Sequence, residues 1–473
     1  MLACTSSPGA VSLPPSAAAG ARSQENSGGA GVAANTPSAG AQAGSFAGNP
    51  STSAGLPAVA GAAPDPPKPE VVGPGTVVGE PTDEASHIFD PAVVHTFDVE
   101  IAPADLATVN ANPAAEQYVP ARLRFEGQAY EVGYRYKGSL GAFFPPCTNI
   151  LSGQKEGKCS IKLSFNWMVP EGRFFGLKKL LFHAMNNDRS MLRERLGYAL
   201  FREMGVPASR ASHAVLRVNG QAEIYALVEE IDSRFTRSRF TEGGKGNLYK
   251  EIWPVHDDPK AYVAALETNE NQNPSADRVL RFEQAVSQGP DAMKAWMDLD
   301  VTSSYMAVDR VILNDDGAFH YYCFARAIGN NPMPPGNHNY YWYEAEKVDR
   351  LWIVPWDLDM AMNDETGQAH IPVDWRKKPS ADECNVCSAS ALGAGGPPSG
   401  CDRVMQGFQA WQASYDAKVD SFIAGPFRKA AVDQKLSTWK QQVIRAGFSV
   451  DERAIGALTT VLDAARVNRG FKY

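Results

Sequence analysis

The sequence predicts an α+β fold, and three patterns lead to this prediction. Residues 158–165 alternate apolar and polar side chains as a strand does, and residues 214–228 form two apolar runs around an Asn-Gly pair. Residues 301–313, like long stretches near the C-terminus, repeat apolar residues at helical spacing. The chain has 473 residues and is 44% hydrophobic, so it can bury a sizeable core and form about two or three domains or lobes.

The N-terminal segment has the composition of a disordered tether. Its first 64 residues are dominated by Ala, Gly, Ser and Pro, with Arg22 and Glu25 as the only charged side chains and Phe46 as the only aromatic one. Such a segment buries too little apolar surface to offset the entropy lost on ordering it. We therefore expect the folded chain to begin near His87, after a tether over residues 1–86.

The first half of the chain contains a strand, a helix and a hairpin. Lys158 and Lys162 share one face of the strand, because side chains alternate along it. Residues 186–205 are predicted to form a helix that Asp188 or Ser190 can cap, and the helix carries an apolar stripe of Leu192, Leu196, Ala199, Leu200 and Met204. The hairpin at residues 214–228 turns at its Asn-Gly pair.

Most of the remaining chain has helical spacing of its apolar residues. The predicted helices cover residues 261–267, 277–287, 291–298, 301–313, 403–415, 430–446 and 450–468. Residues 338–344 and 350–356 differ, because they are rich in aromatic and β-branched residues and flank a polar turn. They predict a second hairpin.

Acidic residues bracket this aromatic hairpin. Asp315 and Asp316 precede it, Asn339 lies within it, and Asp357 and Asp359 follow it. Their carboxylate and amide oxygens can converge at one end of a small sheet, and such hard ligands suit Mg²⁺. The pattern indicates a metal-phosphate site for phosphoryl transfer. Solvated turns, helix caps or a structural Ca²⁺ site are the alternatives.

An ordered series of short motifs resembles the CotH family of spore-coat-type atypical kinases. The motifs are VGYRYKGS at 132–139, KCSIKLSF at 158–165, DxSxLRE at 188–194, VNG at 218–220, YALVEEID at 225–232, NLYK at 247–250, NxD at 314–316, NYY at 339–341 and PWDLD at 355–359. The resemblance implies a divergent, two-lobed protein-kinase-like fold. A small β-rich N-lobe would cover residues 87–245, and a mainly helical C-lobe residues 246–473.

The resemblance also implies roles for acidic and amide residues. Asp316 resembles the catalytic base, and Asp357 resembles the aspartate that binds metal in kinases. Asn339 resembles a second metal ligand, and Asp359 is a competing candidate for that role. About two dozen residues separate Asp316 from Asn339, against about four in an ordinary kinase catalytic loop.

Five further residues are candidates for contact with ATP. By this resemblance Lys162 or Lys158 would meet the phosphates, and a solvent-facing strand lysine is the alternative for each. Lys137 lies in a short glycine-containing loop that suits close approach to a phosphate or any tight turn. Glu194, on the predicted helix, would pair with the phosphate lysine. Surface ion pairs with neighbouring arginines are its alternative role. Glu229 would lie where a hinge meets adenine, or would be a charge at a strand end.

Charge and hydropathy limit the partners. A net charge of −8 without a basic run argues against nucleic acid as a main partner. No apolar run is long enough to span a bilayer. A membrane is therefore expected to be a partner only through an N-terminal lipid, and the protein substrate is unknown.

The cysteines indicate export. Cys4 follows Met-Leu-Ala, which resembles the end of a bacterial lipoprotein signal without its preceding charged and apolar regions. We expect an exported, cell-surface lipoprotein or extracellular protein, with a cytoplasmic location as the alternative. Six further cysteines predict three disulfides, with Cys147–Cys159 as the preferred pair. Cys384, Cys387 and Cys401 lie in one loop, where disulfides are favoured over a Zn²⁺ site.

Two functions follow from these patterns. The leading one is an ATP-dependent protein kinase that transfers the γ-phosphoryl group to Ser or Thr of a protein substrate with Mg²⁺. The other is a catalytically silent surface or structural module that keeps the kinase-like fold and a divalent cation site. The acidic residues favour the enzyme, while the long insertion and the scarcity of ATP outside the cytoplasm favour the module.

Overall fold

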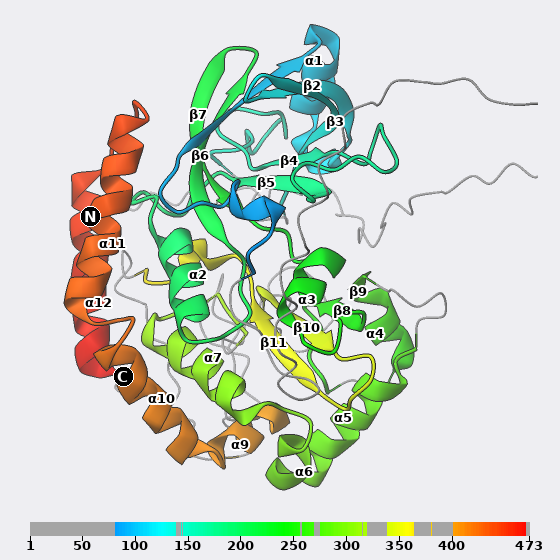
Figure 1. Ribbon diagram of the computed structural model, residues 1–473, viewed down its shortest axis with the longest axis vertical. Helices are drawn as coiled ribbons and strands as arrows, with labels where there is room; N and C mark the ends of the chain where they lie inside the picture. The colour runs from blue at the N-terminus through cyan, green and yellow to red at the C-terminus, as the bar shows by residue number, and fades with distance from the viewer. Residues whose placement is uncertain are drawn as a thin grey trace, which may run out of the picture. The chain divides into compact units, whose positions relative to one another are not determined.

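The computed structural model describes residues 81–138, 143, 145–255, 258–268, 275–314, 316–318, 338–363, 380 and 401–469. In these residues strands and helices are mixed, which confirms the predicted α+β class (Figure 1). Most of the predicted tether, including Cys4, lies outside the described residues. The described chain begins just before a short 3-10 helix, η1 (Glu84–Ser86).

Seven strands close into a barrel in the order β1-β2-β3-β4-β5-β7-β6. All neighbours are antiparallel except β1 and β6, which pair in parallel and close the barrel. The strands are β1 (His95–Ile101), β2 (Val119–Phe125), β3 (Gln128–Tyr136), β4 (Ile161–Ser164), β5 (Lys179–His183), β6 (Ala211–Val218) and β7 (Gln221–Val228), and α1 (Pro103–Ala111) connects the first two.

Alternation along the barrel strands places apolar residues inside. The residues of β2 are buried and exposed in strict turn. Aromatic rings fill the interior, with Phe97 stacked on Phe125 and Phe165 stacked on Phe174. The predicted hairpin is confirmed, because β6 and β7 pair around Asn219 and Gly220, which both have the positive φ that such a turn requires.

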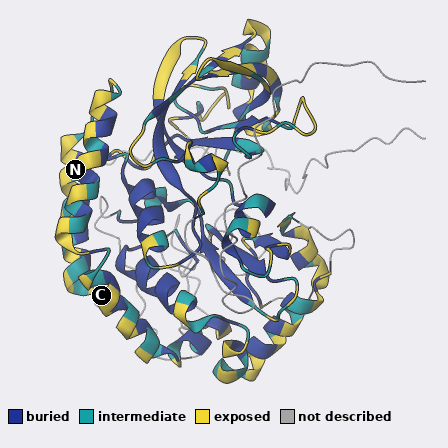
Figure 2. Cartoon of the chain, in the orientation of Figure 1, coloured by how far each residue is buried: buried dark blue, intermediate teal, exposed yellow. Residues whose placement is uncertain are grey.

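A second sheet has the order β11-β10-β8-β9. Its strands are β8 (Asn247–Lys250), β9 (Leu266–Thr268), β10 (Tyr340–Glu344) and β11 (Leu351–Pro355). Every residue of β10 and β11 is buried, and the two strands pair with Tyr341 opposite Val354. The predicted aromatic hairpin is therefore confirmed, and it forms the interior of this part of the fold rather than a surface ribbon (Figure 2).

The helices around this sheet match most of the predictions. The described ones are α2 (Arg193–Glu203), α3 (Ser233–Arg239), α4 (Pro259–Ala264), α5 (Asp277–Gln288), α6 (Pro290–Lys294), α7 (Leu299–Val311), α9 (Arg403–Gln409), α10 (Gln412–Ala424), α11 (Lys429–Arg445) and α12 (Glu452–Asn468). As expected, acidic residues begin the last helix, where the Asp451 side chain accepts a hydrogen bond from Ala454 N–H.

Besides α2, three predicted helices have the wrong extent. The helix over 291–298 ends at Lys294. The helix over 261–267 ends at Ala264, because Leu266 begins β9 and pairs with β8. The helix over 403–415 is two helices, because the Ala410 N–H donates to the Gly407 carbonyl, three residues back, and closes α9. The spacing of apolar residues predicts neither the pairing of a short strand nor the residue at which a helix ends.

Helix α2 begins later than predicted, at Arg193. It is also buried, whereas one alternative placed its Glu194 on the surface. The Asp188 carboxylate accepts a hydrogen bond of 2.7 Å from the Arg193 N–H. Asp188 therefore satisfies the first backbone amide of the helix, although it lies five residues before that amide. Residues 193–201 are all buried (Figure 2). Glu194 is 1% exposed. The alternative prediction that Glu194 forms ion pairs on the surface is therefore wrong.

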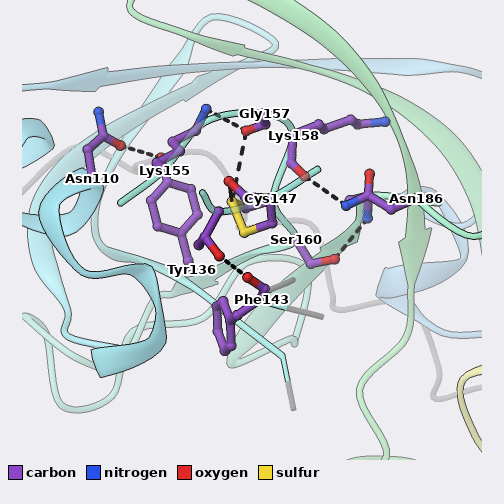
Figure 3. The surroundings of a disulfide bond; sticks show 12 residues. Asn110, Tyr136, Phe143, Cys147, Lys155, Gly157, Lys158, Ser160 and Asn186 are labelled. Carbon is purple, nitrogen blue, oxygen red and sulfur yellow. Dashed lines mark hydrogen bonds between the residues drawn. A yellow bond between two sulfur atoms is a disulfide. The ribbon is translucent and has the colours of Figure 1, made fainter. Parts of the chain in front are cut away.

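The Cys147–Cys159 disulfide is confirmed. It joins the middle of the connection between β3 and β4 to the end of that connection just before β4 (Figure 3). Beside it, Asn110 accepts hydrogen bonds from the Tyr136 hydroxyl and from the Lys155 backbone N–H. Cys401 is also disulfide-bonded. Cys323, Cys384 and Cys387 lie outside the described residues. Among the described helices, none has the length and apolar character needed to cross a membrane.

Candidate functional site

Three side chains from three elements form a hydrogen-bonded chain. Lys137 directly follows β3, His183 ends β5, and Glu194 lies in the first turn of α2. The Lys137 Nζ donates to Nε2 of His183 at 2.9 Å, and Nδ1 of His183 lies 2.7 Å from Oε1 of Glu194. Because an ammonium can only donate, Nε2 accepts and Nδ1 carries the proton that Glu194 accepts.

The pKa of each basic group agrees with this proton arrangement. Burial, followed by the charge of Lys137, lowers the pKa of His183 to about 3, so the imidazole is neutral at pH 7. Burial also lowers the pKa of Lys137 to about 8, against the opposing attraction of Asp357. Burial raises the pKa of Glu194 well above its usual range, and the Asp357 charge raises it further. The site is therefore poor in solvent and rich in charge.

Asp357 completes this cluster. It follows β11 in the left-handed conformation with φ of 51°, and its backbone N–H donates to the Tyr198 hydroxyl of α2 at 3.0 Å. One ligand atom from each of His183, Glu194 and Asp357 lies within 4.8 Å of the other two. The second carboxylate oxygen of Glu194 is buried and has no hydrogen-bond partner in the described part of the chain.

The close approach of α2 holds Asp357 in place. Gly197 lies against Leu358, and a Cβ at Gly197 would lie 2.9 Å from a methyl group of Leu358. Glycine at this position therefore allows the segment after β11 to contact the helix that carries Glu194. The Tyr198 hydroxyl then satisfies the backbone amide of Asp357.

The other acidic candidates lie near this cluster. The Asn339 Nδ2 donates to the Asp316 carboxylate at 2.8 Å and to the Asp316 carbonyl at 3.0 Å. Asp359 accepts a hydrogen bond from Asn187 at 3.1 Å. Burial raises the pKa of Asp359 well above its usual range, and the charges of Asp357, Glu194 and Asp316 add to this shift. The fold thus brings these carboxylates together, while Asp315 lies outside the described residues.

Lys162 points toward the same region from β4. Its Nζ lies 3.3 Å from Glu230, which also pairs with Lys179 at 3.6 Å. The charges of Lys162 and Lys250 both depress the pKa of Lys137, so the three ammonium groups lie within electrostatic range of one another. A cluster of positive charge beside carboxylates is a suitable environment for phosphate and a metal ion.

Two candidates have other partners. Lys158 donates to the Ile224 carbonyl, and its Nζ lies 4.5 Å from the centre of the Tyr225 ring. Glu229 is 1% exposed and forms ion pairs at 2.6 Å, 3.2 Å and 2.6 Å with three arginines, Arg210, Arg234 and Arg239. The nucleotide-binding roles of Lys158 and Glu229 stay predictions.

Sequence reasoning missed His183, Lys250 and Tyr198. Lys250 ends the NLYK motif, so that motif was a usable signal for it. His183 follows an apolar strand and Tyr198 lies within a buried helix, and neither residue belongs to a motif of known spacing. Only the pairing of β5 within the barrel and the packing of α2 bring them to the site.

Comparison with known proteins connects this geometry to a family. The family model described as CotH kinase protein matches residues 135–459, which is more than half of the chain and contains every candidate site residue. The chain belongs to the CotH kinase protein family. The resemblance inferred from the sequence motifs is therefore confirmed.

A curated relative agrees with this membership. The Inner spore coat protein H-like protein of Bacillus subtilis (strain 168) is 35% identical to this chain over 74 residues. The match spans 16% of this chain and 23% of that protein, so it covers less than a quarter of the relative's length. CotH membership suggests a kinase-related function for this chain.

Proposed function

We propose that this CotH family member is a protein kinase that transfers the γ-phosphoryl group of ATP to a Ser or Thr hydroxyl with Mg²⁺. The observation that carries the proposal is the Lys137–His183–Glu194 chain beside Asp357. Phosphoryl transfer requires a cation on the nucleotide phosphates, a helix glutamate that positions it, and a carboxylate on metal. Here a neutral histidine links the lysine and the glutamate.

The donor set suits Mg²⁺. Asp357 and Asp359 offer carboxylate oxygens, and the Oδ1 of Asn339 is a further oxygen because its Nδ2 donates to Asp316. Glu194, which keeps one buried carboxylate oxygen without a hydrogen-bond partner in the described residues, lies within electrostatic range of Asp357. Both nitrogens of His183 are occupied, so oxygen donors dominate. When bound, Mg²⁺ supplies positive charge that stabilises the phosphoryl oxygens during transfer.

The protein's own residues then have separate tasks. Asp316, whose carboxylate is held by Asn339, orients the acceptor hydroxyl and accepts its proton. Lys137 neutralises negative charge on the phosphates, with Lys162 as a second cation from the neighbouring strand β4. Glu194 holds the histidine that positions Lys137.

We also propose that residues 87–245 and 246–473 correspond to the N-lobe and C-lobe of a kinase-like fold. Strands β1–β7 belong to the first range, and strands β8–β11 with most of the described helices belong to the second. The candidate residues come from both ranges, with Glu194 in the first and Asp357 in the second. This division supports a site that forms where the two parts meet.

Label transfer tests the kinase proposal. Purified full-length protein is incubated with Mg²⁺, radiolabelled ATP and a general protein acceptor such as casein, alongside Asp316→Ala and Asp357→Ala. Removing either carboxylate should lower incorporation by at least about 100-fold. Asp98→Ala, which removes an exposed carboxylate of β1, is the matched control and should keep full activity. Equal incorporation by all four proteins would favour a catalytically silent module that retains the fold.

We propose that the protein works outside the cytoplasm, where disulfides persist. The Cys147–Cys159 disulfide supports this location. A lipid on Cys4 would attach the protein to a membrane. The substrate would be another protein. Labelling cells with a radioactive lipid precursor tests the attachment: the wild-type protein should be labelled and Cys4→Ala should not. An unlabelled wild-type protein would contradict the lipid anchor.

A further inference from the structure

A second cluster of metal-ligand side chains lies on the barrel. His87 precedes β1, His95 is the first residue of β1, and Glu126 lies in the turn between β2 and β3. One ligand atom from each side chain lies within 4.8 Å of the other two. All three residues precede residue 135, where the family match begins, and none has a task in the proposed phosphoryl transfer.

The hydrogen bonding of His95 leaves one ring nitrogen directed into this cluster. Its Nε2 lies 2.8 Å from the carbonyl oxygen of His87. A carbonyl can only accept, so Nε2 carries the proton, and in the neutral ring Nδ1 keeps its lone pair. Nδ1 lies 3.8 Å from Oε1 of Glu126. A lone pair facing a carboxylate oxygen is repulsive unless a positive charge lies between them.

The remaining distances suit a single ion. The Nε2 of His87 lies 2.9 Å from the same Oε1 of Glu126. Bonds of about 2.0–2.1 Å to a tetrahedral Zn²⁺ place neighbouring ligand atoms about 3.3 Å apart, so 2.9 Å and 3.8 Å bracket the required separation. His95 is only 7% exposed, and its hydrogen bond to the His87 carbonyl fixes the orientation of its ring. The side chains of His87 and Glu126 are 45% and 50% exposed, so they can adjust around an ion.

The surroundings favour a transition metal over Mg²⁺. The His87 carbonyl that accepts from His95 is the kind of outer partner that fixes the orientation of a metal-binding histidine. Phe125 lies against both imidazoles, with ring centroids 6.2 Å from His87 and 5.3 Å from His95. Two nitrogen donors and one carboxylate match the ligand preferences of Zn²⁺ rather than those of an oxygen-binding cation.

We propose that His87, His95 and Glu126 bind a divalent transition-metal cation of the Zn²⁺ class, with water completing the coordination. The ion clamps the segment before β1 to the barrel. The same segment is already held by Asp83, which forms ion pairs with Arg210 at 2.9 Å and with Arg234 at 2.6 Å. The proposed ion therefore extends an existing attachment, and its role is structural.

Metal binding by the untagged full-length protein tests this site. The protein is stripped with a chelator and titrated with Zn²⁺ in excess Mg²⁺, and calorimetry gives the stoichiometry and affinity. The double variant His87→Ala/Glu126→Gln changes only half-exposed side chains and keeps the His87 carbonyl that orients His95. Asp357→Asn is the matched control, because it alters the cluster of His183, Glu194 and Asp357 and leaves the proposed Zn²⁺ ligands intact.

Wild type and Asp357→Asn should each bind one more equivalent of Zn²⁺ than the double variant, or bind it at least about 100-fold more tightly. Zn²⁺ should raise the midpoint of thermal unfolding of the wild type by about 3 °C and leave that of the double variant unchanged. Equal stoichiometry and affinity in wild type and double variant would overturn the proposal. The cluster would then be an ion pair of a protonated histidine with Glu126.

Discussion

The Nζ of Lys137 reaches Glu194 only through His183, to which it donates at 2.9 Å. A direct ion pair between the phosphate lysine and a helix glutamate was the expectation from the sequence. The imidazole inserts between them, and because it is neutral it transmits orientation without adding charge. We therefore propose Lys137, which lies within electrostatic range of Asp357, as the phosphate-binding lysine in preference to Lys158 and Lys162.

Replacing Lys137 should abolish most of the phosphate transfer. Lys137→Met removes a cation that would stabilise charge on the phosphates, so we expect label incorporation from ATP to fall by about 100- to 1,000-fold. Lys158→Met is the matched control, because the Lys158 amine contacts the Ile224 carbonyl and the Tyr225 ring instead. A larger loss in Lys158→Met than in Lys137→Met would reverse this assignment.

The histidine bridge predicts a difference between two substitutions. His183→Leu removes both hydrogen bonds and leaves Glu194 without its donor, so kcat should fall by about 10- to 100-fold. His183→Gln retains one donor and one acceptor and should recover part of that loss. Steady-state assays over ATP concentration separate kcat from KM. Equal activity of both variants and wild type would show that the bridge does not position Lys137.

The Tyr198 hydroxyl should matter more for activity than for stability. Tyr198→Phe removes the acceptor of the Asp357 N–H, and this should cost about 1 kcal/mol of unfolding free energy. Freed from this bond, Asp357 should bind Mg²⁺ less well, so the Mg²⁺ concentration that gives half-maximal labelling should rise several-fold. Tyr130→Phe, a partly buried tyrosine of β3, provides the control. An unchanged Mg²⁺ requirement in Tyr198→Phe would contradict the positioning role.

Loss of the Cys147–Cys159 disulfide should destabilise the barrel. The disulfide closes a loop with a sequence separation of 12 residues, and restricting such a loop in the unfolded chain contributes about 3 kcal/mol. Denaturant unfolding of Cys147→Ser/Cys159→Ser against wild type measures this difference. Added reductant should lower the unfolding free energy of the wild type more than it lowers that of the variant. A variant as stable as the wild type would refute the expectation.

The buried Glu229 predicts a pH dependence of stability. Burial alone would raise its pKa, but Arg239 and Arg210 lower it to about 2. Because the folded pKa lies below the unfolded value, the carboxylate stabilises the fold above the unfolded pKa, and this stability is lost as the pH falls toward 2. Glu229→Gln should therefore cost about 3 kcal/mol at pH 7.

The difference between Glu229→Gln and wild type should shrink between pH 5 and pH 3. Denaturant unfolding at several pH values measures it. Glu131→Gln, which disrupts an exposed pair with Arg122, is the control and should change stability by less than about 1 kcal/mol at every pH. A pH-independent difference for Glu229→Gln would mean that the carboxylate is not ionised in the folded protein.

Local patterns were enough to predict several elements. The Asn219-Gly220 turn requires positive φ at both residues, so the β6–β7 hairpin was recognisable from two letters of sequence. The aromatic hairpin of β10 and β11 and the helix α5 follow from period-2 and helical spacing. The ends of α2 and α9 were misplaced, because helix boundaries depend on hydrogen bonds that periodicity does not report.

The sequence by itself determined the α+β class, the two hairpins, the Cys147–Cys159 pair and the CotH family, because these depend on neighbouring residues or on ordered motifs. Only the tertiary structure decided which side chains meet. The antiparallel pairing of β3 and β5 with opposite sides of β4 brings the ends of β3 and β5 to the same edge of the barrel, and the packing of Gly197 against Leu358 brings α2 to Asp357. Such contacts join residues distant in the chain, and no local pattern encodes them.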